Sequence, residues 1–269
     1  MSINYAFIGS GSMARAMIGG IITSGLAMPD CVIAANPSAS KLDALKKDFS
    51  IRTIQKDNAA AAAQADVVIL SVKPHLYETV IAEIKDVIPP ETIVVIIAAG
   101  QTIAANESRF GKPVKLARVM PNTPALVGEA MSAVCFNAEI SDADQAIVLA
   151  MLRSFGKAEI VSERLMDAVT GVSGSSPAYV YLFIEAMADA AVLHGMPRTQ
   201  AYTFAAQSVL GAAKMVLETG THPGALKDAV CSPGGTTIEA VAALERSGMR
   251  AAVIDAIDAC IKKSQDMSK

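Results

Sequence analysis

The chain has 269 residues, which is enough for one large or two ordinary domains with a substantial core. Apolar residues make up 52% of the sequence and charged residues 18%, a balance that excludes an intrinsically disordered protein. The net charge is only −3, no basic cluster stands out and Trp is absent, so the sequence gives no support to nucleic-acid binding.

The start of the chain runs directly into a predicted strand at Tyr5–Ile8, without the charged and apolar regions of a signal peptide. The Ala-rich run at 59–63 is far too short to cross a bilayer. The cysteines form no CxxC pair, which favours reduced thiols and argues against a metal site; they lie at 31, 135, 231 and 260. We therefore expect a cytoplasmic protein with no bound metal and no membrane contact.

A glycine-rich loop follows the first predicted strand and precedes a predicted helix. Its sequence, Gly9-Ser10-Gly11-Ser12-Met13-Ala14, has the G-x-G-x-x-A pattern in the setting that dinucleotide-binding folds require. Gly9 permits the tight turn, Gly11 lets the backbone approach a pyrophosphate, and Ala14 keeps helix and strand close. The loop therefore predicts a cofactor site that includes Gly9, Gly11, Ser12, Met13 and Ala14.

Apolar runs then alternate with helical segments, as in a doubly wound parallel sheet. The middle runs are almost continuously apolar, as expected for strands covered on both faces. The last two strands, with a helix at 142–154 between them, complete the sheet beyond its parallel core. Predicted strands lie at 31–35, 51–54, 66–72, 92–98, 114–119, 133–137 and 157–161. The sequence thus predicts a Rossmann-like α/β domain over residues 1–162.

The end of the second predicted strand bears on the choice of cofactor. NAD-selective sites usually carry Asp or Glu here, whereas this chain has no carboxylate before Asp43. Asn36 and Ser38 can donate to a 2′-phosphate, and Lys41 lies close enough in sequence to help. These residues favour NADPH, with weaker use of NADH left open. The alternative is that residues 36–38 are only a turn that caps the next helix.

From about residue 163 onward, helical periodicity replaces the strand runs. The predicted helices lie at 163–170, 175–194, 198–219, 222–230, 236–246 and 249–265, with breaks that include Gly171 and Gly174. The long helices are apolar around most of their circumference and therefore need more than one layer of cover. We expect residues 163–269 to be an all-helical domain that forms an interlocked homodimer, with further assembly of dimers left open. A bundle within a single chain is the alternative.

A tight corner, Ser232-Pro233-Gly234-Gly235, separates two of these helices, the second starting near Thr236. The adjacent glycines let backbone N–H groups converge, and the helix N-terminus adds unpaired donors and partial positive charge. Such a corner suits a small carboxylate, with two threonine hydroxyls beside it. The alternative is a plain connection between helices with Thr236 or Thr237 as the N-cap.

The segment Val230–Ala240, followed by Leu244-Glu245, resembles the signature of pyrroline-5-carboxylate reductases. Residues 222–228 extend the match, and residues 170–179 resemble the family's segment leading into its first long dimer helix. Agreement runs from residue 5 to about residue 246, which is nearly the whole chain. The resemblance implies a Rossmann-like domain followed by a helical dimerisation domain.

Three later strand ends should face the same crevice as the glycine loop. In the family that this chain resembles, the corresponding segments line the nicotinamide end of the cofactor, and Asn58 matches a position beside the adenosine portion. The residues so implied are Val72, Lys73, Pro74, Ala98, Gly100, Met120 and Asn122. For Lys73, a solvated lysine in a loop is the alternative.

The resemblance implies hydride transfer from NADPH to the C=N carbon of 1-pyrroline-5-carboxylate, giving L-proline, the last step of proline biosynthesis. We expect backbone N–H groups around Gly234, Gly235 and Thr236 to bind the substrate carboxylate, with Ser175 and Ser232 also lining the site. By resemblance, Thr237 should hydrogen-bond the ring nitrogen and act as the catalytic residue. Few ionisable groups are needed, because the main task is to position the ring.

Two other functions compete with this one. A β-hydroxyacid dehydrogenase would use a lysine on an interior helix, but no lysine occurs between Lys157 and Lys214. His75, His194 and His222 lie at predicted element ends, where structural or surface roles are expected. A catalytically silent NADP-binding sensor could use the sheet domain alone, but it would not require the corner at 232–237.

Overall fold

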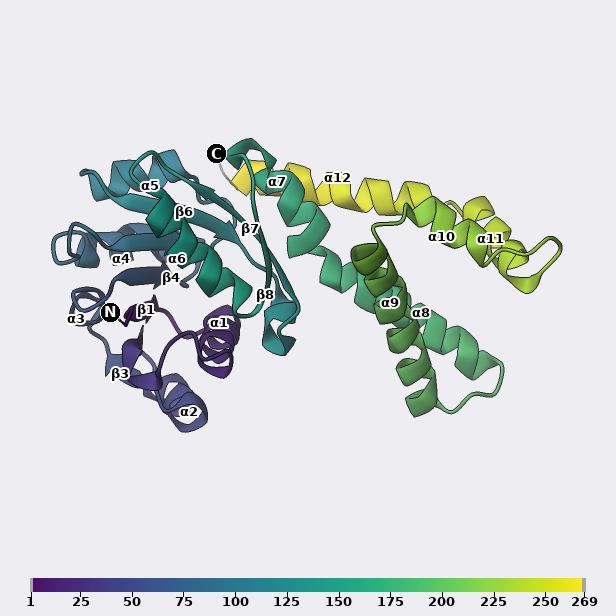
Figure 1. Ribbon diagram of the computed structural model, residues 1–269, viewed down its shortest axis with the longest axis horizontal. Helices are drawn as coiled ribbons and strands as arrows, with labels where there is room; N and C mark the ends of the chain where they lie inside the picture. The colour runs from purple at the N-terminus through teal and green to yellow at the C-terminus, as the bar shows by residue number, and fades with distance from the viewer. Residues whose placement is uncertain (1, 268–269) are drawn as a thin grey trace. The chain divides into compact units, whose positions relative to one another are not determined.

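The computed structural model describes residues 2–267 (Figure 1). The chain divides into two compact units. The first, the sheet unit, runs to Ser175 and takes in the residues from Cys260 onward; the second, the helical unit, is Ser176–Ala259. All four cysteines are free thiols.

The sheet unit is built on one eight-stranded sheet in the order β3-β2-β1-β4-β5-β6-β7-β8. Strands β1 to β6 are parallel, β7 is antiparallel to β6, and β8 is parallel to β7. This confirms the doubly wound sheet and the two strands expected beyond its parallel core. The strands are β1 Tyr5–Ile8, β2 Val32–Asn36, β3 Arg52–Gln55, β4 Val67–Leu70, β5 Ile93–Ile96, β6 Lys115–Met120, β7 Ala130–Phe136 and β8 Gly156–Ile160.

Helices cover both faces of this sheet, which explains the almost continuous apolar runs of its central strands. One face packs against α1 (Ser12–Thr23), α2 (Ala39–Phe49) and α6 (Asp142–Arg153) through buried residues such as Met17 and Leu45. The other packs against α3 (Asn58–Ala62), α4 (Tyr77–Ile84) and α5 (Ile103–Phe110). Short 3-10 turns complete the unit: η1 Pro29–Cys31, η2 Pro74–Leu76, η3 Thr123–Val127 and η4 Glu163–Leu165.

Strands β4 and β5 end earlier than the sequence predicts. Their apolar runs suggest strands to residues 72 and 98, but the last paired residues are Leu70 and Ile96. Beyond this pair the backbone N–H groups of Ile97 and Ala98 donate to the hydroxyl of Tyr77 instead. The strand predictions at 66–72 and 92–98 are therefore too long, because a side chain replaces the ladder.

The sequence also predicts a helix break at Gly171 and Gly174, and the α-helix is interrupted at this place, although by a helical turn of another kind. After α7 (Met166–Val169) the chain makes a π-helical turn, η5 (Thr170–Gly174), and leads into α8 (Ser176–Leu193). The N–H of Ser175 donates to the carbonyl of Thr170 at 2.8 Å, the bond to the fifth preceding residue that defines such a turn. Glycine is a weak helix former, but this turn tolerates both of them.

The helical unit contains α8, α9 (Arg198–Thr219), α10 (Pro223–Ala229), α11 (Thr236–Arg246) and the first part of α12 (Met249–Met267). Helices α8 and α9 pack against each other, yet α8 buries only Ala188, and α9 only Ala201 and Ala205. Large apolar side chains on these two helices are exposed in the single chain, among them Tyr181, Leu182, Phe204, Leu210 and Leu217. A self-contained bundle would bury them, so the single-chain alternative is wrong.

One helical stretch of the described chain, Glu163–Leu193, has the length and composition of a membrane span. Its mean hydropathy is 1.2 over the most apolar window, and only 6% of that window is buried in the single chain. Length and composition alone are weak evidence, because helices that are covered by other protein pass the same test.

Candidate active site

The glycine-rich loop has the geometry of a phosphate-binding turn. Gly9 has φ +108°, and a Cβ placed on it would lie 2.6 Å from the carbonyl oxygen of Ser71 and 3.1 Å from a methyl group of Val72. Any other residue at position 9 would therefore be strained and would clash. At Gly11, in contrast, a Cβ would meet no described atom within 4 Å, so a ligand can approach its backbone.

The N-terminus of α1 opens directly above this loop. Gly11 is the N-cap, no side chain caps the helix, and its first turn contains no acidic residue. The first backbone N–H groups of a helix have no intrahelical partners and attract anions. Gly11 and Ser12 are exposed, Met13 is half-buried and Ala14 is fully buried against the sheet.

Ser10, inside the same loop, carries a hydroxyl that the sequence reasoning did not single out. It is 8% exposed, and its Oγ is one of two buried side-chain oxygens in the described chain without a hydrogen-bond partner; the other is Oγ of Ser132. A buried polar atom without a partner is unfavourable unless something else completes it. The open Gly11 backbone and the unpaired Ser10 hydroxyl both fit a bound dinucleotide.

Asn36 and Ser38 form a tight turn at the end of β2. The Oδ1 of Asn36 accepts the N–H of Ser38 at 2.8 Å, and Ser38 is the N-cap of α2 without using its own hydroxyl as a cap. Its Oγ lies 3.1 Å from Oγ of Ser40, and Lys41 is exposed in the first turn of α2. The turn at residues 36–38 that was the alternative to a cofactor role is thus present. The hydroxyl of Ser38 and the ammonium group of Lys41 do not take part in its hydrogen bonds.

The ends of β4 and β5 carry the next group of predicted residues. Val72 lies against the Gly9 turn, Lys73 is exposed at the start of η2, and Pro74 is the first residue of that turn. Gly100 has φ +74°, and a Cβ on it would lie 2.8 Å from the carbonyl oxygen of Met267 near the end of α12. Asn58, at the start of α3, donates from Nδ2 to Glu83 Oε2 at 2.6 Å.

Two hydroxyl groups that the sequence does not predict connect these strand ends. Ser71 Oγ is 3.0 Å from the carbonyl oxygens of Ile8 and Gly9. Tyr77 is fully buried and donates to the carbonyl of Leu70 at 2.8 Å. Burial raises the pKa of the Tyr77 hydroxyl, so it stays protonated and remains a donor at neutral pH. Neither Ser71 nor Tyr77 belongs to a sequence motif. Their hydrogen bonds join strand ends that are distant in the sequence, so their role becomes visible only in the folded sheet.

The end of β6 brings predicted cofactor and substrate residues together. Asn122 donates from Nδ2 to the carbonyl of Ser173 and accepts the N–H of Met131 at Oδ1, both at 3.0 Å. A Cβ placed on Gly174 would lie 3.6 Å from Met120 Sδ, so Met120 also faces the π-helical turn. Ser175 ends that turn, and its Oγ accepts from Cys260 Sγ at 3.3 Å.

The corner at 232–235 has the open backbone that the sequence predicts. Gly234 has φ +65° with open space around it, and the N–H of Gly235 donates to the carbonyl of Ser232 at 3.0 Å. Helix α11 begins at Thr236 with Gly235 as N-cap and no side-chain cap. The alternative that Thr236 or Thr237 caps this helix is therefore wrong, and both hydroxyls are available for other partners. Thr237 is half-buried, whereas Ser232, Gly234 and Thr236 are exposed.

The predicted residues thus fall into two groups. Those of the glycine loop and of the strand ends, together with Ser175, belong to the sheet unit, and Ser232–Thr237 belong to the helical unit. His222 has a structural role, since its Nδ1 accepts the N–H of Gly224 at the start of α10. The described residues contain no group of three or more His, Cys, Asp or Glu arranged to hold a metal.

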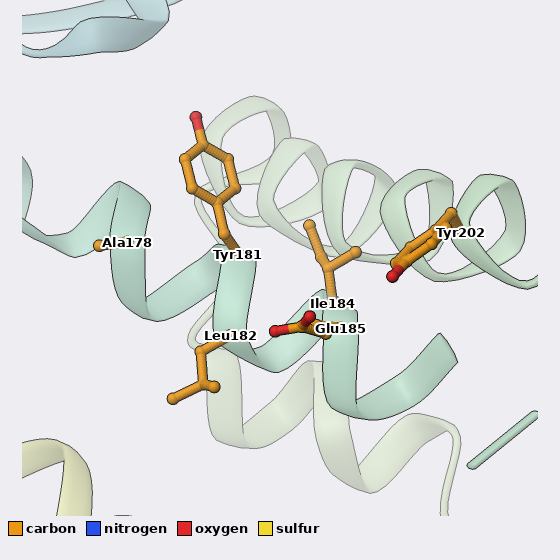
Figure 2. Close-up of a pocket in the computed structure, with 6 residues that line it drawn as sticks. All are labelled: Ala178, Tyr181, Leu182, Ile184, Glu185 and Tyr202. Carbon is orange, nitrogen blue, oxygen red and sulfur yellow. The ribbon is translucent and has the colours of Figure 1, made fainter. Parts of the chain in front are cut away.

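A groove of about 510 Å³ lies on the exposed side of α8 and α9. Figure 2 shows Tyr181, Ile184 and Glu185 projecting from α8, and Tyr202 reaching toward them from α9. Leu182 and Ala178 complete the lining. The groove contains one carboxylate among aromatic and aliphatic groups, which resembles a protein interface more than a site for chemistry.

Comparison with known proteins identifies both parts of the chain. Residues 163–267 match the family model for pyrroline-5-carboxylate reductase dimerisation, and residues 4–100 match that for NADP oxidoreductase, coenzyme F420-dependent. The chain is 52% identical to the pyrroline-5-carboxylate reductase of Escherichia coli (strain K12), with 100% of both chains covered. It is 43% identical to that of Methanosarcina acetivorans, with 98% of this chain and 97% of the relative covered.

Solved structures agree. A pyrroline-5-carboxylate reductase from Coxiella burnetii superposes with a TM-score of 0.93 at 35% identity, covering 100% of both chains. The Plasmodium falciparum pyrroline carboxylate reductase with NADP bound superposes with a TM-score of 0.90 at 31% identity, covering 99% of this chain and 98% of that one. A ketol-acid reductoisomerase at 15% identity, with a TM-score of 0.62, shares the fold alone. The chain belongs to the pyrroline-5-carboxylate reductase family.

Proposed function

We propose that this chain reduces 1-pyrroline-5-carboxylate to L-proline with NADPH. The reaction adds one hydride to the C=N carbon and one proton to the ring nitrogen, and releases NADP⁺. The observation that carries the proposal is similarity over the whole chain to pyrroline-5-carboxylate reductases, at 52% identity to the Escherichia coli protein. The open glycine loop and the open corner at 232–235 support it.

The cofactor is assigned to the carboxyl edge of the sheet. The pyrophosphate would lie over Gly9, Gly11, Ser12, Met13 and Ala14, where the N-terminus of α1 and the unpaired hydroxyl of Ser10 favour an anion. Asn36, Ser38 and Asn58 would hold the adenosine end. Val72, Lys73, Pro74, Ala98, Gly100, Met120 and Asn122 would line the nicotinamide end. Asn122 already uses both ends of its side-chain amide, so its backbone groups are the ones available. Asn58 uses Nδ2 to bond Glu83.

When bound, NADPH supplies the hydride, and the residues of this chain orient the acceptor. The N–H groups of Thr236 and Thr237 start a helix without a side-chain cap, so they can bind the substrate carboxylate next to Gly234 and Gly235. The hydroxyl of Thr237 hydrogen-bonds the ring nitrogen and fixes the face that is presented for reduction. We also assign Ser175 and Ser232 to substrate binding. Positioning is the main contribution, since a protonated imine is already a good hydride acceptor.

The chain acts as a homodimer through residues 163–269, with the boundary of the sheet domain at 162. The dimerisation model, which starts at residue 163, supports this division. A partner helix in the groove of α8 and α9 would cover the apolar side chains that the single chain exposes. The same cover accounts for the apolar stretch Glu163–Leu193 without a membrane. We infer a cytoplasmic enzyme that binds neither nucleic acid nor membranes; association of dimers into larger assemblies stays open.

The test is NADPH oxidation, followed at 340 nm with 1-pyrroline-5-carboxylate, with proline identified as the product. Turnover that requires both compounds supports substrate, cofactor and reaction together. Binding of NADPH without turnover would defeat the proposed reaction and favour a silent NADP-binding protein. Neither binding nor turnover would also defeat the assignment of the glycine loop.

A further inference from the structure

The hydroxyl of Tyr77 occupies the point where strands β4 and β5 stop pairing. Its hydrogen is donated to the carbonyl of Leu70 at 2.8 Å. Its oxygen accepts the N–H groups of Ile97 and Ala98, each at 3.2 Å. Leu70 and Ile96 are the last paired residues of the two strands, so the hydroxyl replaces the next rung of the ladder. The two strand ends are therefore connected through the Tyr77 hydroxyl and do not hydrogen-bond each other directly at this point.

No apolar residue of similar size could do this. Phe at position 77 would remove the hydrogen-bond partner of one carbonyl, that of Leu70, and of two N–H groups, those of Ile97 and Ala98. Tyr77 has no exposed surface. Each buried polar group left unsatisfied is costly, and backbone groups would shift to regain partners. The expected consequence of losing this hydroxyl is therefore a rearrangement of residues 70–74 and 96–100.

A second hydroxyl extends the connection to the glycine loop. Ser71, next to Leu70, contacts the carbonyl oxygens of Ile8 and Gly9 through its Oγ. Strands β1, β4 and β5 are neighbours in the sheet, so the two hydroxyls link three successive carboxyl ends. The segments after these ends are Gly9–Ala14, Val72–Pro74 and Ala98–Gly100.

We assign the adenosine end of the cofactor to the other side of this arrangement. Asn36 is the last residue of β2 and Ser38 follows it, and β2 flanks β1 on the side opposite to β4. The crevice of such a sheet forms where the strand order reverses, and a dinucleotide spans it with one half on each side. The Tyr77 hydroxyl forms its hydrogen bonds with the ends of β4 and β5, on the side assigned to the nicotinamide.

We propose that Tyr77 is a positioning residue that sets the nicotinamide half of the cofactor site without touching the cofactor. The inference rests on the proposed NADPH-dependent function. The buried hydroxyl of Tyr77 sets the spacing between the segments Val72–Pro74 and Ala98–Gly100. The hydroxyl acts through the backbone N–H groups of Ile97 and Ala98.

The test compares how tightly the variant Tyr77→Phe binds the whole cofactor, NADPH, and a ligand that contains only its adenosine half. We expect the dissociation constant of NADPH, measured by its fluorescence, to rise about tenfold, in line with one or two unsatisfied polar groups. Adenosine 2′,5′-bisphosphate, which carries only the adenosine half, should bind within about twofold of the unchanged protein by calorimetry. A merely structural role would weaken both ligands together. Equal weakening of both, or no change in NADPH binding, would overturn the proposal.

Tyr5→Phe is the matched control. Tyr5 is also buried and lies in the same sheet, but at the start of β1, the edge opposite to the cofactor. The substitution removes the same atom, and both dissociation constants should stay unchanged. An effect of Tyr5→Phe equal to that of Tyr77→Phe would also overturn the proposal.

Hydrogen exchange on the unaltered protein tests the same point if Tyr77→Phe does not fold. The amides of Ile97 and Ala98 should exchange slowly before any cofactor is added, because the Tyr77 hydroxyl already holds them. Rapid exchange of both amides in the free protein would defeat the inference. Neither test needs the imine substrate. Failure of the proposed reaction is therefore distinguishable from failure of this inference, because it would show as NADPH binding without turnover in the unaltered protein.

Discussion

The hydroxyl of Ser232 lies directly against the backbone of Gly235. A Cβ placed on Gly235 would overlap Ser232 Oγ and would lie 3.2 Å from the Ser232 carbonyl oxygen. The carbonyl also accepts the N–H of Gly235, which closes the turn. The glycine at 235 is therefore what allows the serine hydroxyl to stay beside the start of α11.

Gly235→Ala should displace this hydroxyl and weaken substrate binding. We expect KM for 1-pyrroline-5-carboxylate to rise about tenfold, because one hydrogen bond to a charged group is lost. The dissociation constant of NADPH should not change, since this corner belongs to the helical unit. Ser232→Ala should give a similar loss, and the double variant should add little to either change. Strictly additive effects would show that the alanine does not act through Ser232.

Thr237→Ala should lower turnover by at least about tenfold, because the hydroxyl that hydrogen-bonds and orients the reacting ring nitrogen is lost. Cofactor affinity should stay unchanged. Steady-state rates with saturating NADPH provide the measurement, and Thr237→Ser, which keeps the hydroxyl, is the matched control. Turnover that is the same in the alanine variant and the unaltered protein would remove Thr237 from the mechanism.

Asn36→Asp should reverse or abolish the preference for NADPH over NADH. The carboxylate can still accept the N–H of Ser38, so the turn at the end of β2 is kept. Only the charge changes, and it repels a 2′-phosphate while accepting from a ribose hydroxyl. Fluorescence titration should show a change of about tenfold or more in the ratio of the two dissociation constants. An unchanged ratio would mean that the 2′-phosphate does not lie near Asn36.

Local sequence predicted the sheet unit well. The runs of apolar residues located the strands, and glycine at positions 9 and 11 identified the loop, because both signals arise from neighbouring residues. The predicted helices at 198–219 and 236–246 coincide with α9 and α11. The roles of individual site residues, Thr237 among them, stay predictions.

Features that depend on distant residues were not predictable. Tyr77 meets Ile97 and Ala98 only after the sheet has formed, and nothing in its local sequence distinguishes it from an ordinary core residue. The contact of Asn122 with Ser173 spans 51 positions, and that of Ser175 with Cys260 spans 85. The low helix propensity of glycine predicted an interruption at Gly171 and Gly174, but not its form as a π-helical turn, because that form depends on more than local propensity.

Asp144 should make the sheet unit sensitive to acid. Burial alone raises the pKa of Asp144, but hydrogen bonds from Ser141 and Lys115 outweigh it, so the pKa lies below the ordinary 3.8. The ionised Asp144 carboxylate therefore stabilises the folded state, and this contribution is fully present above pH 3.8. It is lost as the pH falls through the lower pKa that Asp144 has in the folded protein. Asp144 also completes a capping box with Ser141 at the start of α6.

Asp144→Asn keeps an acceptor for Ser141 but loses the charge that pairs with Lys115, so it should lower the free energy of unfolding at pH 7 by about 1 kcal/mol. The difference from the unaltered protein should shrink as the pH falls below 3.8. Urea unfolding at several pH values provides the measurement. Asp142→Asn, at an exposed position in the first turn of the same helix, should cost only about 0.3 kcal/mol. A difference that does not depend on pH would contradict the role given to the Asp144 charge.

Leu182→Lys should disrupt self-association. Leu182 lines the groove on α8 and is 68% exposed in the single chain, so a partner that covers it gains apolar contact. In an interface with twofold symmetry each substitution counts twice, and burial of one leucine contributes about 1.5–3 kcal/mol. The expected loss of about 3–6 kcal/mol raises the dimer dissociation constant about 10²–10⁴-fold.

Light scattering after size-exclusion chromatography should then show a monomer at micromolar concentration, where the unaltered protein has the mass of a dimer or a multiple of it. Met28→Lys is the matched control, because Met28 is 70% exposed but lies in the sheet unit, beside η1. Its mass should not change. If both variants dissociated, general instability would explain the result; if neither did, the groove of α8 and α9 would not be the contact between subunits.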